Sequence, residues 1–78
     1  MAVQVHFSGV RYSVQIPAMK TLLRVYCGMQ SADAEVFAER VAAGDRVSVY
    51  MEDVDTAYSL ASEMVNLGVN AEADEGYD

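Results

Sequence analysis

The chain has 78 residues, 53% of them hydrophobic, which predicts one small folded domain with no room for a second core. Its formal net charge of −7 argues against nonspecific binding to nucleic-acid phosphates, which requires a basic patch. One cysteine and one histidine exclude an intrachain disulfide framework and argue against a zinc site. No apolar run approaches the roughly 18 residues of a membrane span, and no signal-peptide core opens the chain, so we expect a cytoplasmic protein.

The first sixteen residues predict a β-hairpin. Residues 3–7 and 10–16 each alternate apolar and polar side chains, and Ser8-Gly9 between them has the length of a two-residue turn. In that register Phe7 lies opposite Val10, and every apolar residue falls on one face.

Two helices are predicted next. Pro17 ends the second strand and suits the first turn of a helix, whose apolar residues recur at helical spacing from Met19 to Cys27. Gly28 occupies the position of a left-handed C-cap. Ser31 is the expected N-cap of the second helix, which Gly44 ends.

The second half of the chain predicts a strand, a helix and a weaker strand. Residues 46–51 alternate and are rich in β-branched side chains. Asp53 or Asp55 caps the following helix, and Gly68 closes it. Residues 69–73 form a short strand, which we place at a sheet edge.

The predicted order, ββ-αα-β-α-β, indicates an α/β fold. A two-layer sandwich results when helices cover one face of a small, mostly antiparallel sheet. We assign residues 1–73 to a single domain and residues 74–78 to a solvated acidic tail.

Few residues of the chain could act in catalysis, and we expect neither an enzyme nor a bound cofactor. His6 has no carboxylate in its half of the chain to orient it as a general base. Cys27 falls on the apolar side of its helix, as a buried free thiol does. The run Glu52-Asp53-Val54-Asp55 lacks the spacing and the central glycine of a calcium loop, so a helix-capping role explains it better.

Charge is distributed unevenly along the chain. Residues 1–32 carry three cations and no acid, whereas residues 33–78 carry all 12 acids and two arginines, so +3 and −10 add to −7. One interpretation is a dipolar molecule whose acidic side binds a partner with a basic surface; the other is that the acids keep the domain soluble. Tyrosines beside acids are typical of protein contact surfaces. The candidate partner-binding residues are Tyr50, Glu52, Asp53, Asp55, Tyr58 and Glu63.

Residues 19–75 resemble the ClpS-like superfamily, which contains the Clp-protease adaptor and the C-terminal domain of the bacterial ribosomal stalk protein. The resemblance rests on the helix beginning Met19-Lys20-Thr21-Leu22-Leu23, on the second amphipathic helix, and on Val49-Tyr50-Met51-Glu52-Asp53-Val54 at a strand-to-helix junction. It implies a protein-binding module. Where the adaptor holds its substrate-gripping acids and histidine, this chain has Gln15-Ile16-Pro17-Ala18 and Val41-Ala42, so the resemblance does not imply a ligand.

Two functions stay open. The first is a small non-catalytic, adaptor-like module that docks on a larger protein machine through the acidic half, without direct contact to nucleic acid or membrane. The second is an acidic inhibitor, similar in size and charge to phage-encoded anti-CRISPR proteins, that occupies a basic nucleic-acid-binding groove of its target as a nucleic-acid mimic. We expect a monomer or weak homodimer, because Glu72 on the last strand discourages edge pairing.

Overall fold

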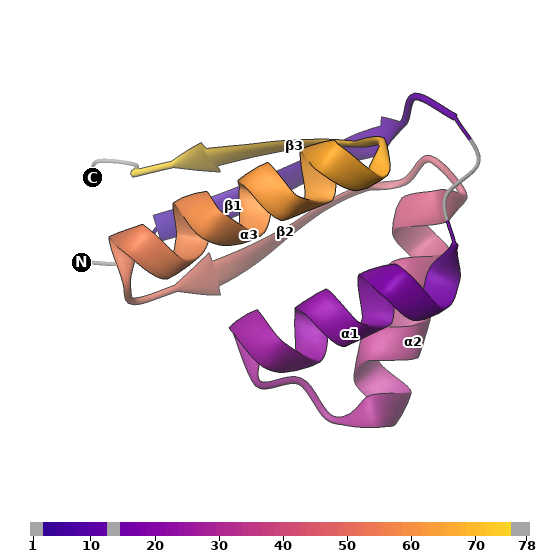
Figure 1. The fold of residues 1–78 in the computed structure, drawn as a ribbon, viewed down its shortest axis with the longest axis horizontal. Helices are drawn as coiled ribbons and strands as arrows, with labels where there is room; N and C mark the ends of the chain where they lie inside the picture. The colour runs from indigo at the N-terminus through magenta and orange to yellow at the C-terminus, as the bar shows by residue number, and fades with distance from the viewer. Residues whose placement is uncertain (1–2, 13–14, 76–78) are drawn as a thin grey trace.

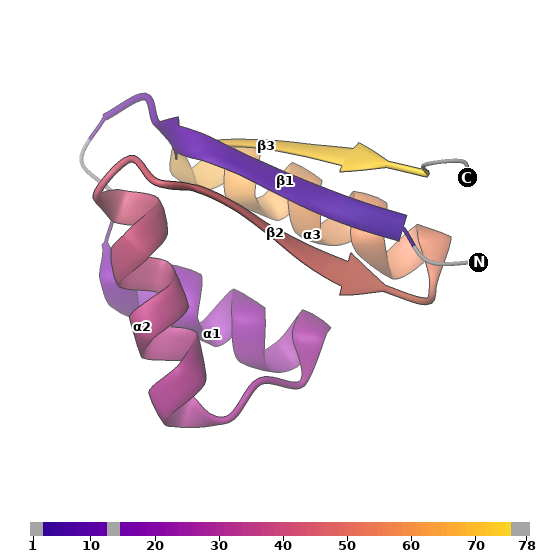
Figure 2. The ribbon, with the colours of Figure 1, turned by 180° about the vertical axis from the view of Figure 1, so that it is seen from behind.

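A computed structural model describes residues 3–12 and 15–75 of the chain. Its elements are β1 (Val3–Val10), α1 (Ile16–Cys27), α2 (Ser31–Ala42), β2 (Arg46–Met51), α3 (Val54–Leu67) and β3 (Val69–Asp74). The strands form one antiparallel sheet in the order β2-β1-β3. The three helices lie on one side of this sheet, α2 and α3 against the strands and α1 packed on those two helices. The other face, seen in Figure 2, carries none of the described helices (Figures 1 and 2). The predicted α/β fold, with helices on one face of a small antiparallel sheet, is confirmed.

The predicted hairpin is wrong. Val3–Val10 is one continuous strand that pairs with β2 on one side and β3 on the other, so its partners are distant in sequence. Phe7 faces Val47 and Ala71 instead of Val10. The Ser8-Gly9 pair lies within the strand, where the register with β3 shifts between Phe7 and Val10, and Gly9 supplies the positive φ of 97° at this irregularity. The central position gives β1 two hydrogen-bonding neighbours, and both come from the second half of the chain.

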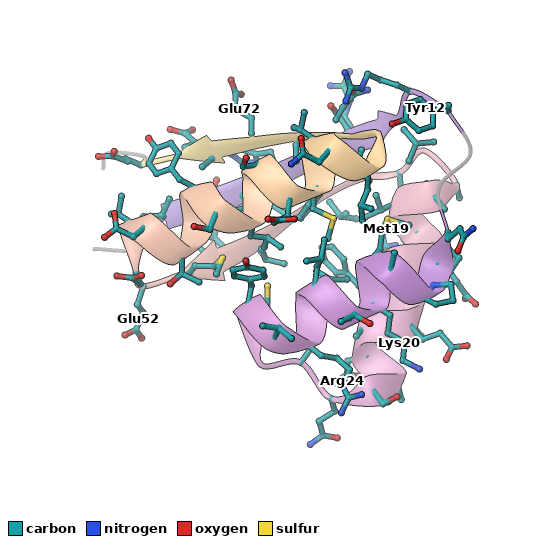
Figure 3. The ribbon with its side chains drawn as sticks, in the orientation of Figure 1. Tyr12, Met19, Lys20, Arg24, Glu52 and Glu72 are labelled. Atoms are coloured by element: carbon teal, nitrogen blue, oxygen red, sulfur yellow. The ribbon has the colours of Figure 1, made fainter. Side chains whose placement is uncertain are left out.

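The segment expected to be the second strand has another role. Arg11 and Tyr12 form a bend, residues 13–14 lie outside the described residues, and Ile16 opens α1. The Arg11 backbone N–H donates to the Gly68 carbonyl at 2.7 Å, and its Nη2 donates to the Val65 carbonyl at 2.6 Å. The last turn of α3 contains no basic residue, and Arg11 therefore provides the positive charge that interacts favourably with the C-terminal end of this helix. The hairpin register, which puts every apolar residue on one face, also implies a core position for Tyr12, but Tyr12 is 58% exposed and lies beside this end of α3 (Figure 3).

The helix and strand ends in the rest of the chain follow local signals. Gly28 and Gly68 both adopt left-handed C-cap conformations, as predicted. Of the two candidate caps for α3, Asp53 is the N-cap and Asp55 lies in the first turn. The predicted N-cap of α2 is wrong: Gln30 holds that position without a side-chain bond, so Ser31 is already the first helical residue. β3 occupies a sheet edge, as predicted, and extends through Asp74, one residue further than expected.

The core lies between the sheet and the helices. Alternate residues of β1 point into it, so Val3, Val5 and Phe7 are almost fully buried. The Phe7 ring meets Phe37 of α2 edge to face, with centroids 5.6 Å apart. The buried residues of the helices are Met19, Leu23, Ala34, Ala38, Val41, Ala57, Leu60, Ala61 and Met64. None of the described helices is both long and apolar enough to cross a lipid bilayer.

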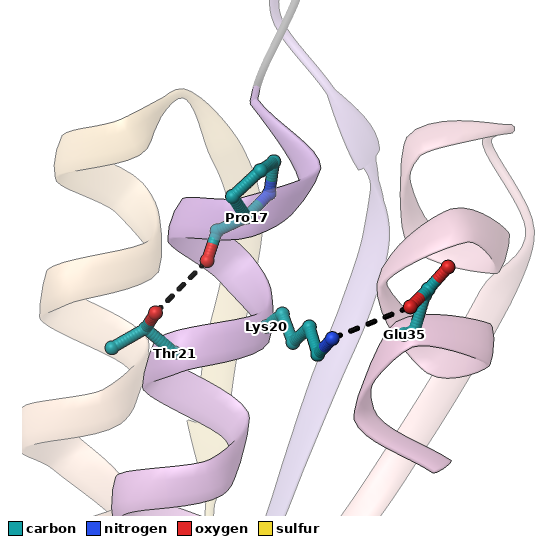
Figure 4. A network of polar contacts seen from close by, with 4 residues as sticks. All are labelled: Pro17, Lys20, Thr21 and Glu35. Atoms are coloured by element: carbon teal, nitrogen blue, oxygen red, sulfur yellow. Dashed lines mark hydrogen bonds and ion pairs between the residues drawn. The ribbon is translucent and has the colours of Figure 1, made fainter. Parts of the chain in front are cut away.

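A polar contact joins the first two helices. Lys20 Nζ lies 3.3 Å from Glu35 Oε1, which pairs α1 with α2 (Figure 4). On the next residue of α1, the Thr21 hydroxyl donates to the Pro17 carbonyl at 3.0 Å. The Lys20 amine is thus engaged within the domain, on the side of α1 that faces α2.

Candidate functional site

Four of the six residues predicted to bind a partner lie at the junction of β2 and α3, and Tyr58 and Glu63 lie further along α3. Tyr50 is 71% exposed on the sheet face that carries no helix, because its neighbours Val49 and Met51 point into the core. Glu52 and Asp53 form the connection, which projects from one end of the molecule (Figure 3). The others are exposed residues of α3, namely Asp55, Tyr58 and Glu63.

Asp53 organises this junction. Its Oδ2 accepts a hydrogen bond from the Thr56 N–H at 2.9 Å and a second, short one from the Thr56 hydroxyl. These bonds favour the ionised carboxyl group and lower the pKa of Asp53. The cap therefore keeps a fixed negative charge at the start of α3, where the helix dipole also favours it.

Tyr58 and Glu63 occupy different places on α3. The Tyr58 hydroxyl donates to Glu75 Oε2 at 3.0 Å, which connects the first half of α3 to the residue that follows β3. Glu63 is eight residues beyond Asp55, about 12 Å further along the helix axis. The structure thus brings Tyr50, Glu52, Asp53 and Asp55 to one corner of the molecule, with Tyr58 one turn away and Glu63 outside it.

A shallow hollow of about 310 Å³ opens at this corner, where the C-terminal end of α1 approaches the β2–α3 connection. Its lining comes from the last turn of α1 and from the junction, namely Tyr26, Cys27, Tyr50, Met51, Glu52, Asp53 and Thr56. Partial burial raises the pKa of the Cys27 thiol and so favours its protonated, less nucleophilic form.

Sequence reasoning assigned Tyr26 and Cys27 to the apolar side of α1 and missed their position at the hollow. The side chains that precede them at helical spacing, Met19 and Leu23, are fully buried, whereas Tyr26 and Cys27 are half-buried. Their place in the last turn before Gly28 is the one signal in the sequence, because the end of a helix often projects beyond the core that it covers.

The cations of the described residues lie away from this corner. Lys20 pairs with Glu35, Arg40 Nε lies 3.4 Å from Asp45 Oδ2, and Arg11 binds the far end of α3. Arg24 projects from the side of α1 turned away from α3 (Figure 3). Arg46 is at the opposite end of β2, about 17 Å along the strand from Met51. The corner therefore presents carboxylates that no basic side chain of the described residues neutralises.

The uncovered face of the sheet aligns three side chains that are remote in sequence. His6 Nδ1 lies 2.7 Å from Ser48 Oγ, and His6 Nε2 lies 3.6 Å from Asp74 Oδ2. Sequence reasoning found no carboxylate near His6, because strand pairing alone brings Asp74 across from β3. A hydroxyl, an imidazole and a carboxylate in line can pass a proton, but His6 and Asp74 are 38% and 58% exposed. On an open face of this kind, the row stabilises the pairing of three strands.

Comparisons of the chain with protein-family models, with curated proteins and with solved structures found no match. Among the described residues, no three His, Cys, Asp or Glu side chains gather closely enough to hold a metal ion. The candidate site therefore consists of the corner formed by β2, α3 and the end of α1, with its carboxylates, its tyrosines and its hollow.

Proposed function

We propose that this protein is a small, non-catalytic interaction module that docks, in the manner of an adaptor, on a larger protein with a basic surface. The corner supports this proposal, because Glu52, Asp53 and Asp55 lie there beside the exposed ring of Tyr50. Carboxylates without basic neighbours attract a basic surface over a distance, and tyrosine supplies apolar contact area once the surfaces meet. The resemblance of residues 19–75 to the ClpS-like superfamily also supports a protein-binding role.

Docking at the corner follows from the charge distribution. The complex forms without direct contact to nucleic acid or membrane, in the cytoplasm, and the module acts as a monomer or weak homodimer. Glu72 is an exposed residue of the edge strand β3, and its charge opposes edge-to-edge pairing between two copies.

The test is capture of the partner from bacterial lysate with the tagged protein, at low and at moderate salt, followed by mass spectrometry. The matched pair of variants is the double change Glu52→Gln and Asp55→Asn against the double change Glu39→Gln and Asp33→Asn, at two exposed acids of α2. We expect one stoichiometric partner that survives moderate salt, disappears with the corner variant and persists with the α2 variant. A partner that the two variants retain equally would refute docking at the corner.

A second function is favoured by the exposed carboxylates elsewhere on the surface. Glu63 and Glu72 have no basic partner among the described residues, and they lie on different elements. An acidic inhibitor that occupies a nucleic-acid-binding groove would use such charges additively. In that case binding falls steeply as salt rises, and single acid-to-amide changes anywhere on the acidic surface weaken it by similar small factors.

A further inference from the structure

The hollow at the corner has a composition that suits one class of ligand. Two of its lining residues, Glu52 and Asp53, carry carboxylates, and none carries a positive charge. The carboxyl of Asp53 stays ionised because Thr56 donates to it, and Glu52 is exposed at the rim. The charged groups of this lining therefore favour a cation.

The C-terminal end of α1 adds to the negative electrostatic potential of the hollow. Tyr26 and Cys27 are the last two residues of α1, so the hollow opens at the negative end of the helix dipole. The basic residue of this last turn, Arg24, projects away from α3 and does not neutralise the hollow (Figure 3). The opposing positive end belongs to α3, and Asp53 already caps it.

The hollow also offers an aromatic contact. Tyr26 is half-buried in its lining, and the exposed Tyr50 borders it from β2. A guanidinium group stacks on a tyrosine ring and binds a carboxylate at its edge, which a compact ammonium group does less well. At about 310 Å³ and open to solvent, the hollow is at the small end of ligand sites and suits a side chain that a partner inserts.

We propose that this hollow receives an arginine side chain from the basic surface of the partner, with the guanidinium between Tyr26 and Glu52. The inference rests on the proposed docking function and names the contact at its centre. It makes Tyr26, a residue of the first half of the chain, part of the binding surface.

The probe is the capped tripeptide acetyl-Gly-Arg-Gly-amide, titrated into the ¹⁵N-labelled protein at low salt and followed by NMR chemical shifts. The matched probe replaces arginine by citrulline, which keeps the shape and removes the charge. We expect weak, millimolar binding of the arginine peptide, with amide shifts concentrated at residues 26–27 and 50–56. The citrulline peptide should bind at least about fivefold more weakly, because it loses the charge–carboxylate attraction.

The variants separate the two contacts. Tyr26→Leu should weaken binding about two- to fivefold, whereas Tyr26→Phe keeps the ring and should bind as the unchanged protein does. Glu52→Gln should weaken binding by a similar factor, while Glu39→Gln on α2 should leave it unchanged. The Tyr26→Phe control shows whether a loss in Tyr26→Leu comes from the ring, and the spectrum of each variant reports whether it is folded.

Several results would overturn the inference. Equal binding of the two peptides would show that the charge plays no role. Chemical-shift changes that extend to Glu63 and Glu72 would indicate nonspecific electrostatic attraction. Absence of binding up to about 50 mM peptide would likewise refute the site. If the Tyr26→Leu and Glu52→Gln variants bind the captured partner as tightly as the unchanged protein does, the arginine contact is wrong while the docking function stands.

Discussion

The C-terminal end of α3 offers a quantitative test of the packing between distant parts of the chain. Gly68 has φ of 101°, and a Cβ built on it would lie 2.5 Å from Cζ of the Tyr12 ring. Gly44 has a similar φ of 92°, but nothing lies within 4 Å of its Cβ position. Changing each glycine to alanine therefore imposes comparable backbone strain, and only Gly68→Ala also displaces a side chain.

The structure sets the size of the difference. Alanine in a left-handed conformation costs about 1–2 kcal/mol, which applies to both variants. A tyrosine offers about 200 Å² of contact area, and Tyr12 is 58% exposed, so about 80 Å² of it is buried. If the ring gives up half of that contact at about 25 cal/mol per Å², Gly68→Ala costs about 1 kcal/mol more than Gly44→Ala. The melting temperature should differ between the two variants by about 4–8 °C.

Urea unfolding followed by circular dichroism measures the stability of five proteins: the unchanged chain, Gly44→Ala, Gly68→Ala, Tyr12→Ala, and Gly68→Ala in the Tyr12→Ala background. In that background the added cost of Gly68→Ala should fall to that of Gly44→Ala, because no ring remains to be displaced. Equal costs for the two glycine variants, or an excess that survives the removal of Tyr12, would show that the ring does not pack over Gly68.

Three further outcomes follow from burial and ionisation. Leu60→Ala, at a fully buried position, should lower the free energy of unfolding by about 2–5 kcal/mol, while Val25→Ala, at a 71% exposed position, should change it by less than about 0.5 kcal/mol in the same urea assay. The hydrogen bonds from Thr56 lower the pKa of Asp53, so its capping contribution should be present above about pH 4 and be lost as the pH falls through the lower pKa of the folded state. Urea midpoints from pH 2 to 6 should therefore fall less steeply in Asp53→Asn than in the unchanged protein; equal slopes would contradict this assignment. Burial raises the pKa of the Cys27 thiol, so at pH 8 it should react with a disulfide reagent more slowly in the folded protein than in urea, and equal rates would contradict the half-buried position.

The candidate site was predictable only in part. The acids at residues 52–55 cluster in the sequence, and alternation along β2 places Tyr50 on the outside, so these residues are visible without a structure. Glu63 is on the same predicted helix, but the helical rise separates it from the corner. The contribution of α1 was not predictable, because the hollow exists only where the last turn of α1 is packed near the β2–α3 connection.

The sequence by itself determined the elements whose signals act within a few residues. Gly28 and Gly68 end helices because they adopt positive φ without strain, and the carboxylate of Asp53 reaches an amide three residues ahead. Alternation over residues 46–51 marks a strand with one buried face for the same local reason.

Only the tertiary structure decided the role of the first strand. The sequence around Ser8-Gly9 is equally compatible with a hairpin turn and with an irregularity inside a longer strand, since Gly9 permits both. The choice came from β2 and β3, which bind the two edges of β1 from about 40 and 65 residues away and bury Val5 and Phe7 under the helices. Such pairing depends on which strands become neighbours in the folded chain. The same strand pairing places Ser48 and Asp74 on either side of His6.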